Sequence, residues 1–149
     1  MIELLNHEDY RELKTLVTVT EGNSRTVMQA SDIILMASGT ATLEAMLLKK
    51  PMIVCYKMAS LSYRIISSLI RVPYFALPNL LAEKKLVPEL LQDDVTPEKI
   101  IQEIKEIMTQ AQNKKAEHRE TFEKIHQLIR RNASNTAASA VLELCKKNN

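Results

Sequence analysis

The fold is decided by the stretch "SDIILMASGTATLEAMLLKKPMIVCY", residues 31–56, which places a helical pattern between two apolar runs. The runs at 32–37 and 51–56 lack alternation with polar residues, which is typical of parallel strands covered on both faces. The segment 39–50 is typical of a helix, because two lysines end it and a proline follows directly. Strand, helix and strand in this order predict a right-handed crossover and a parallel sheet.

The flanking sequence extends this pattern. Further strands are predicted at 16–20 ("LVTVT") and 74–77 ("YFAL"), and further helices at 23–30 and 60–70. After about residue 87 the pattern becomes helical throughout, with three apolar stripes, at 97–108, 122–129 and 137–145. We therefore predict an α/β fold: a partial Rossmann-like parallel sheet of three or four strands with helices on both faces, followed by an all-helical C-terminal region.

The start of the chain differs from that of a complete doubly wound domain. Such a domain usually opens with a strand, and the turn after that strand often holds phosphate. This chain opens with a polar, helix-like stretch at 6–14. Either the sheet is small, or the chain is the back half of a larger protein.

Composition excludes several classes of function. A net charge of +2 is too small to indicate nucleic-acid binding, and the absence of Trp leaves few rings for bases to stack on. The two cysteines lie far apart, which indicates a reducing compartment and no disulfide framework. We find no metal-ligand spacing, no signal peptide and no apolar run long enough for a membrane span. We expect a cytosolic protein without metal, cofactor or nucleic-acid partner.

The bend at 37–45, "ASGTATLEA", is the candidate binding site. It lies where a strand turns into a helix, and ligands of open α/β sheets bind beyond the carboxyl ends of the strands. Gly39 lets a ligand approach the backbone closely. The first N–H groups of the helix favour an anion, and the hydroxyls of Ser38, Thr40 and Thr42 can donate to it. These groups together predict a cradle for a diphosphate.

Glu44 extends this site along the helix. It follows Thr40 by four residues, so it lies on the same face one turn further, and one helical turn advances about 5.4 Å. A carboxylate at that offset could accept hydrogen bonds from the ribose hydroxyls of the same nucleotide. The alternative stays open at this point: Ser38 is only a helix N-cap, and Glu44 is only a solvated helix residue.

Two longer motifs resemble a known family. "ASGTATLEAMLLKKPMIVCYKM", followed by "VPYFALPNLLAEKKLVPELLQ", resembles the C-terminal part of lipid-A-disaccharide synthase. The combination of "SGTATLE" with "LPNLLA" separates this family from other nucleotide-sugar enzymes. The resemblance implies a GT-B type glycosyltransferase, in which two Rossmann-like domains face each other across a cleft. It implies transfer of 2,3-diacylglucosamine from UDP-2,3-diacylglucosamine to lipid X, which is 2,3-diacylglucosamine 1-phosphate, to form a β-1,6 disaccharide.

The same resemblance assigns roles to residues and regions. Ser38, Gly39 and Thr40 would face the diphosphate of UDP, Glu44 would face the ribose, and Asn79 would line the cleft near the donor. Read alone, Asn79 after Pro78 is equally a turn former. Residues 1–92 would form an incomplete nucleotide-sugar-binding domain, and 93–149 would be helices that pack on it and on an absent N-terminal domain.

That absent domain bears on activity, because the resemblance assigns it the acidic residues that assist catalysis. No Asp or Glu in this chain fits the role of general base, so we expect no sugar transfer by the chain alone. We regard the chain as a fragment, a truncated gene product or one piece of a split enzyme. The partners expected are the two acylated sugar substrates, the absent domain and a second copy of the chain. Two other functions stay open: a stand-alone UDP-sugar-binding module without catalysis, and a helical interaction or membrane-surface protein.

The segment 56–71 has two interpretations. It combines an apolar stripe with basic residues, as does a helix lying on an anionic membrane, and this would place the protein at the cytoplasmic face of the bacterial inner membrane. The same stripe could instead cover one face of the sheet. Elsewhere, His118 and His126 are expected on helix surfaces, and Cys55 is expected to be buried and inert.

Overall fold

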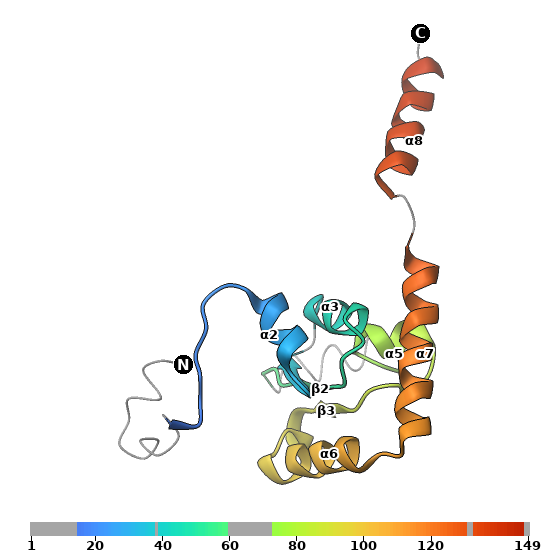
Figure 1. The fold of residues 1–149 in the computed structure, drawn as a ribbon. Helices are drawn as coiled ribbons and strands as arrows, with labels where there is room; N and C mark the ends of the chain where they lie inside the picture. Colours follow the sequence, from blue (N-terminus) through green and yellow to red (C-terminus); the bar gives the residue numbers. More distant parts are fainter. Residues whose placement is uncertain (1–14, 38, 60–72, 131–132, 148–149) are drawn as a thin grey trace. The chain divides into compact units, whose positions relative to one another are not determined.

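The computed structural model describes residues 15–37, 39–59, 73–130 and 133–147 (Figure 1). In chain order the elements are α2 (Ser24–Ala30), β1 (Ile34–Ala37), α3 (Ala41–Leu47), β2 (Met52–Tyr56), α5 (Leu77–Ala82), β3 (Glu89–Leu91), the 3-10 helix η2 (Gln92–Asp94), α6 (Pro97–Thr109), α7 (Gln112–Ile129) and α8 (Ala133–Lys147). The chain divides into two compact units, residues 1–31 and 32–149. The segments predicted to be helical at 6–14 and 60–70 lie outside the described residues.

The sheet is parallel throughout and has the strand order β1-β2-β3. Ile34 of β1 lies opposite Met52 of β2, and Val54 of β2 lies opposite Glu89 of β3. α3 connects β1 to β2, as the strand–helix–strand pattern predicts. The predicted α/β class is therefore confirmed, with three strands and a helical C-terminal region.

The central strand, β2, is buried from both sides. Its side chains alternate between the two faces of the sheet, so Ile53 points to one face while Met52 and Val54 point to the other. Ile53 packs with Leu90 and with Ile107 of α6 in a core cluster. α3 contacts β1 and β2, and Figure 1 shows α3 and α6 on opposite sides of the sheet. Coverage of both faces explains why the strand reads as a continuous apolar run.

In the first unit, α2 confirms the predicted helix, but the predicted strand at 16–20 is wrong. Leu16 lies in a turn with 80% of its surface exposed, and residues 17–20 have no regular structure. Their β-branched composition favours a strand only when a neighbouring strand supplies hydrogen bonds and packing. Within the described residues, no strand pairs with this segment.

The predicted strand at 74–77 is also wrong. This segment bends and leads into α5, which begins at Leu77. Pro78 lies in the first turn of that helix, where its fixed φ suits the helix and its missing N–H costs nothing. The third strand is β3 instead, in a region for which the sequence predicts helices alone.

The three C-terminal helices confirm the predicted stripes. Thr96 is the N-cap of α6, and its side chain accepts a hydrogen bond from Lys99 N at 3.3 Å. α7 buries Phe122 and Ile125. In α8 every side chain described, from residue 135 to 146, is exposed. The predicted division of the chain at residue 92 stays a prediction.

Candidate functional site

The turn after β1 is open and shaped by Gly39. Its φ of +148° lies in a region that side-chain-bearing residues rarely adopt, and a Cβ placed there would meet nothing within 4 Å. Glycine is therefore required by the backbone conformation and not by crowding. Ser38, predicted to face the diphosphate, lies outside the described residues. Gly39 and Thr40 are both exposed.

The helix that follows begins at Ala41, with Thr40 as its N-cap. The Thr40 side chain makes no capping hydrogen bond, so its hydroxyl stays exposed. The expectation that Thr42 donates to an anion is wrong. Its side chain is fully buried, and its hydroxyl donates to the carbonyl oxygen of Gly39 at 2.6 Å. This hydrogen bond from a buried side chain stabilises the glycine turn.

Some backbone N–H groups of the turn donate hydrogen bonds within the protein, and others have no acceptor among the described residues. Thr42 N donates to Gly39 O at 3.1 Å and Leu43 N donates to Thr40 O at 3.0 Å. For the N–H groups of Gly39, Thr40 and Ala41, we find no acceptor among the described residues. The turn therefore has main-chain donors at its exposed tip.

Glu44 lies in the first turn of α3 and is exposed. Its N–H donates to Thr40 O at 3.4 Å, which is the i to i+4 bond of a helix. The structure therefore brings Thr40 and Glu44 onto one helix face, at the carboxyl end of β1.

The other end of α3 is fixed by Lys49, which has a left-handed φ of 59°. Lys49 N donates to Met46 O and Lys50 N donates to Ala45 O, the pair of bonds that closes a helix in a Schellman motif. The Lys49 side chain reaches α7, where its Nζ lies 3.2 Å from Glu123 Oε2. These contacts hold α3, and with it the glycine turn, against α7.

Lys49 makes two further contacts with α7. Its Nζ lies 3.0 Å from His126 Nδ1 and 3.4 Å from the carbonyl oxygen of Phe122. His126 is therefore part of this helix-to-helix connection. The sequence places it simply on a helix surface.

Asn79 is completely buried, and every hydrogen-bonding group of its side chain is used. Its Oδ1 accepts from the N–H groups of Leu86 and Val87, at 2.7 and 2.8 Å. Its Nδ2 donates to Val87 O at 2.9 Å and to Glu89 Oε1 at 2.7 Å. Asn79 thus ties α5 to the segment that leads into β3. The expectation that Asn79 contacts the donor stays a prediction.

Two residues that the sequence reasoning did not single out lie at the start of β3 and directly after its end. The carboxylate of Glu89 accepts hydrogen bonds from Phe75 N at 3.0 Å and Ala76 N at 2.9 Å. Gln92, directly after β3, accepts from Met58 N at 2.8 Å and donates to Met58 O at 3.2 Å. The motif "PELLQ" contains both, but their partners are distant in sequence.

An aromatic pair lies at the carboxyl end of β2. The rings of Tyr56, the last residue of β2, and Phe75 stack with their centroids 6.2 Å apart. The ends of all three strands therefore lead into hydrogen-bonded or stacked turns. A parallel sheet with an open glycine turn at the carboxyl end of β1 defines an α/β domain of the open-sheet class, whose members bind ligands beyond the carboxyl ends of their strands.

Comparison with known proteins narrows this class to one family. The profile of the family described as Lipid-A-disaccharide synthetase matches residues 2–143. The chain is 51% identical over 131 residues to the lipid-A-disaccharide synthase of Hahella chejuensis, covering 88% of this chain and 33% of that protein. It is 48% identical over 130 residues to the lipid-A-disaccharide synthase of Pseudomonas putida strain W619. This alignment covers 87% of this chain and 34% of that protein. The chain belongs to the lipid-A-disaccharide synthase family and spans about a third of the length of these relatives.

Two further findings concern membranes and metals. No helix in the part of the chain that the structure describes is both long and apolar enough to cross a bilayer. The same residues bring together no group of three or more His, Cys, Asp or Glu side chains that could hold a metal ion.

Proposed function

We propose that this chain is the donor-binding part of a glycosyltransferase that makes the lipid A disaccharide. The reaction is transfer of 2,3-diacylglucosamine from UDP-2,3-diacylglucosamine to lipid X, with formation of a β-1,6 linkage. Membership of the family supports the activity, because the relatives are lipid-A-disaccharide synthases. The observation that carries the binding role is the open turn at Gly39, followed on one helix face by exposed Thr40 and Glu44.

The diphosphate of UDP binds at this turn. The positive φ of Gly39 turns the chain without a side chain in the way, so phosphate oxygens can approach the N–H groups of Gly39, Thr40 and Ala41. The Thr40 hydroxyl, and that of Ser38, add donors. Two negative charges at the start of α3 are also favoured by the helix dipole.

Glu44 binds the ribose in this proposal. A carboxylate has only acceptor groups at neutral pH, so it suits a pair of hydroxyl donors on neighbouring carbons. Its position one turn beyond Thr40 matches the step from phosphate to sugar within one nucleotide, about 5.4 Å along the helix. Asn79 remains part of the proposed donor cleft. A direct contact with the donor would require its amide to exchange one of its four hydrogen bonds.

Transfer itself needs groups that we assign to the N-terminal domain. The acceptor hydroxyl must lose its proton to a base as the bond to the sugar forms, and UDP must leave. The turn at Gly39 serves the leaving diphosphate. We assign the base to the N-terminal domain, so the 149-residue chain binds UDP without transferring sugar. The enzyme acts in the bacterial cytoplasm, at the inner face of the membrane that holds its acylated substrates.

Calorimetric titration of the chain with UDP tests the binding role. Saturable binding that weakens at least about tenfold in Glu44→Gln is expected, since a lost pair of charged hydrogen bonds is worth 1.4 kcal/mol or more. Glu98→Gln is the matched control, because Glu98 is an exposed carboxylate in the first turn of α6. Equal effects of both variants would contradict a ribose contact at Glu44.

Co-expression with an N-terminal domain from a relative tests the enzyme role. Recovered transfer from UDP-2,3-diacylglucosamine to lipid X is expected when both pieces are present. Binding of UDP without any recovered transfer would instead favour a stand-alone binding module.

A further inference from the structure

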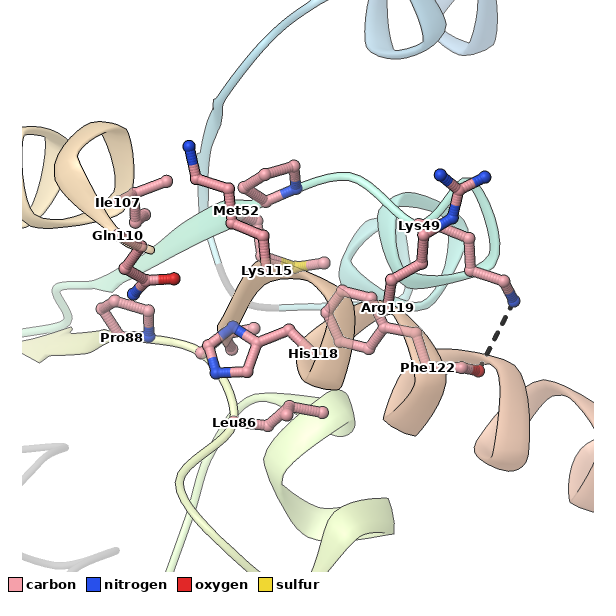
Figure 2. Close-up of a pocket in the computed structure, with 12 residues that line it drawn as sticks. Lys49, Met52, Leu86, Pro88, Ile107, Gln110, Lys115, His118, Arg119 and Phe122 are labelled. Carbon is pink, nitrogen blue, oxygen red and sulfur yellow. Dashed lines mark hydrogen bonds between the residues drawn. The ribbon is translucent and has the colours of Figure 1, made fainter. Parts of the chain in front are cut away.

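A cavity lies at the opposite end of the sheet from Gly39. Met52, the first residue of β2, and Pro88, directly before β3, line it together with residues from α6 and α7 (Figure 2). Gly39 follows the last residue of β1, at the carboxyl edge. Because the strands are parallel, the amino ends of β2 and β3 form the other edge. The cavity is thus separate from the proposed nucleotide site.

The floor of this cavity is apolar. It is formed by five side chains that are buried in the core, namely Met52, Leu86, Val87, Ile107 and Phe122. Water in contact with such a floor has few hydrogen-bonding partners, so an alkyl chain would displace it favourably.

The rim carries positive charge and no negative charge. Lys49, Lys115 and Arg119 line the cavity, and no carboxylate is among its described lining residues. Lys49 is occupied by Glu123, and Lys115 donates to Met108 O at 3.3 Å. For Arg119 the described residues supply no hydrogen bond or ion pair. An arginine with five donors therefore stands at the mouth of an apolar cavity.

The side chain of His118 also lines the cavity. It comes from α7, as do Lys115 and Arg119 (Figure 2). Burial lowers the pKa of His118, and the nearby charges of Lys114 and Lys84 lower it further, against an opposing effect of Glu117. At neutral pH the positive charge at the rim is therefore that of the lysines and the arginine.

We propose that this cavity binds a single-chain anionic amphiphile, a fatty carboxylate, with its tail on the apolar floor and its head at Arg119 and Lys115. Complementarity selects this class. A small anion would leave the floor uncovered, and a neutral amphiphile would give the guanidinium of Arg119 no charged partner. The site is independent of the proposed nucleotide site, because it shares no residue with it.

Dodecanoate, below its micelle concentration, is the probe. The chain is labelled with 13C in its methionine methyl groups, and the Met52 signal is expected to shift saturably on titration, while that of Met36 in β1 stays unchanged. Acetate supplies the head without the tail, and dodecyl maltoside supplies the tail without the charge. Both are expected to bind at least about tenfold more weakly than dodecanoate.

Two variants sharpen the test. Arg119→Gln is expected to weaken dodecanoate binding about tenfold or more, and Arg130→Gln, the matched change at the end of the same helix, to leave it unchanged. Gln110→Trp fills the mouth without emptying the core and should abolish binding. Since Arg119 is exposed, its replacement does not threaten the fold. The proposal is overturned if dodecyl maltoside binds as tightly as dodecanoate, if Arg119→Gln has no effect, or if the folded chain does not bind dodecanoate.

Discussion

The side-chain amide of Asn79 donates a hydrogen bond to Glu89 Oε1 at 2.7 Å, and this contact joins α5 to the first residue of β3. The same carboxylate accepts hydrogen bonds from the backbone at the start of α5, at Phe75 and Ala76. An anion at a helix start is favoured by the helix dipole and by the unpaired N–H groups there. Asn79 and Glu89 therefore form one polar network, in which Asn79 is completely buried and Glu89 is partly buried.

Replacing Asn79 by Ala should be strongly destabilising. The change leaves buried N–H groups of Leu86 and Val87 without their acceptor, and removes the donor that meets Glu89. We expect a loss of about 3 kcal/mol in the free energy of unfolding, measured by urea denaturation. Gln102→Ala is the control, because it removes only an exposed amide contact on α6, and it should cost less than about 0.5 kcal/mol. A small effect of Asn79→Ala would mean that the network is not needed for stability.

Replacing Gly39 by Ala should cost stability through the backbone alone. A methyl group at this position meets open space, so the only penalty is a φ of +148°, worth about 1 kcal/mol or more. Thr40→Ala, one residue on, should cost little, since the Thr40 side chain makes no capping bond. Urea midpoints of the two variants provide the comparison, and equal midpoints would contradict the strained conformation at Gly39.

Two substitutions of Lys49 separate the contribution of its backbone conformation to stability from that of its side-chain contacts. Lys49→Met removes the contacts with Glu123, His126 and the Phe122 carbonyl but keeps a side chain in the left-handed conformation. Lys49→Gly removes the same contacts and relieves the left-handed strain, which is worth about 1 kcal/mol. Thermal unfolding should therefore show Lys49→Gly to be the more stable of the two. The reverse order would show that the buried length of the side chain matters more than the strain.

The lowered pKa of His118 predicts that the stability of the chain depends on pH. Its pKa is lowered from 6.5 in the folded chain, first by burial, so the unfolded chain binds more protons near pH 6. The neutral imidazole thus contributes stability that is present above the unfolded-state pKa and is lost as the pH falls through the lower folded-state value. The melting temperature of His118→Gln should fall less steeply between pH 7 and pH 5 than that of the unchanged chain. Parallel curves would refute the role of His118.

The two cysteines should differ in reactivity. Burial in β2 raises the pKa of the Cys55 thiol, which reduces the fraction of reactive thiolate, whereas Cys145 is exposed on α8. Limited alkylation with iodoacetamide at pH 8, followed by peptide mass spectrometry, should therefore label Cys145 first. Labelling of Cys55 at an equal rate would show that β2 opens easily.

Local patterns were sufficient for the elements whose signals are local. The apolar runs of β1 and β2 and the helical stripes of α6 to α8 predicted those elements. Burial on both faces leaves a continuous apolar run in the sequence, and burial of one helix face leaves a period of about 3.6 residues. β3 has only three residues and is a strand because Glu89 pairs beside Val54 of β2. The segment at 16–20 has the composition of a strand but no partner strand among the described residues.

The same distinction applies to the candidate site. The open turn at Gly39 could be predicted, since a glycine between a strand and a helix permits the positive φ that a tight turn can require. The direction of the Thr42 hydroxyl could not, because it depends on which carbonyl the folded turn brings near. Glu89 and Gln92 were missed for a related reason. Their partners, from Phe75 to Asn79 and at Met58, lie 10 to 34 residues away in the chain.

β2 begins at the cavity with Met52 and ends at the ring stack of Tyr56, about 13 Å away at the rise of a parallel strand. Because β2 is the central strand, its backbone hydrogen bonds open only when both neighbouring strands separate from it. Amide hydrogen exchange along these five residues should therefore slow when either the cavity at Met52 or the glycine turn after β1 is occupied, because each ligand raises the free energy of the same opening event. Two ligands that never touch would protect one shared set of amides, and with both present their protections would add.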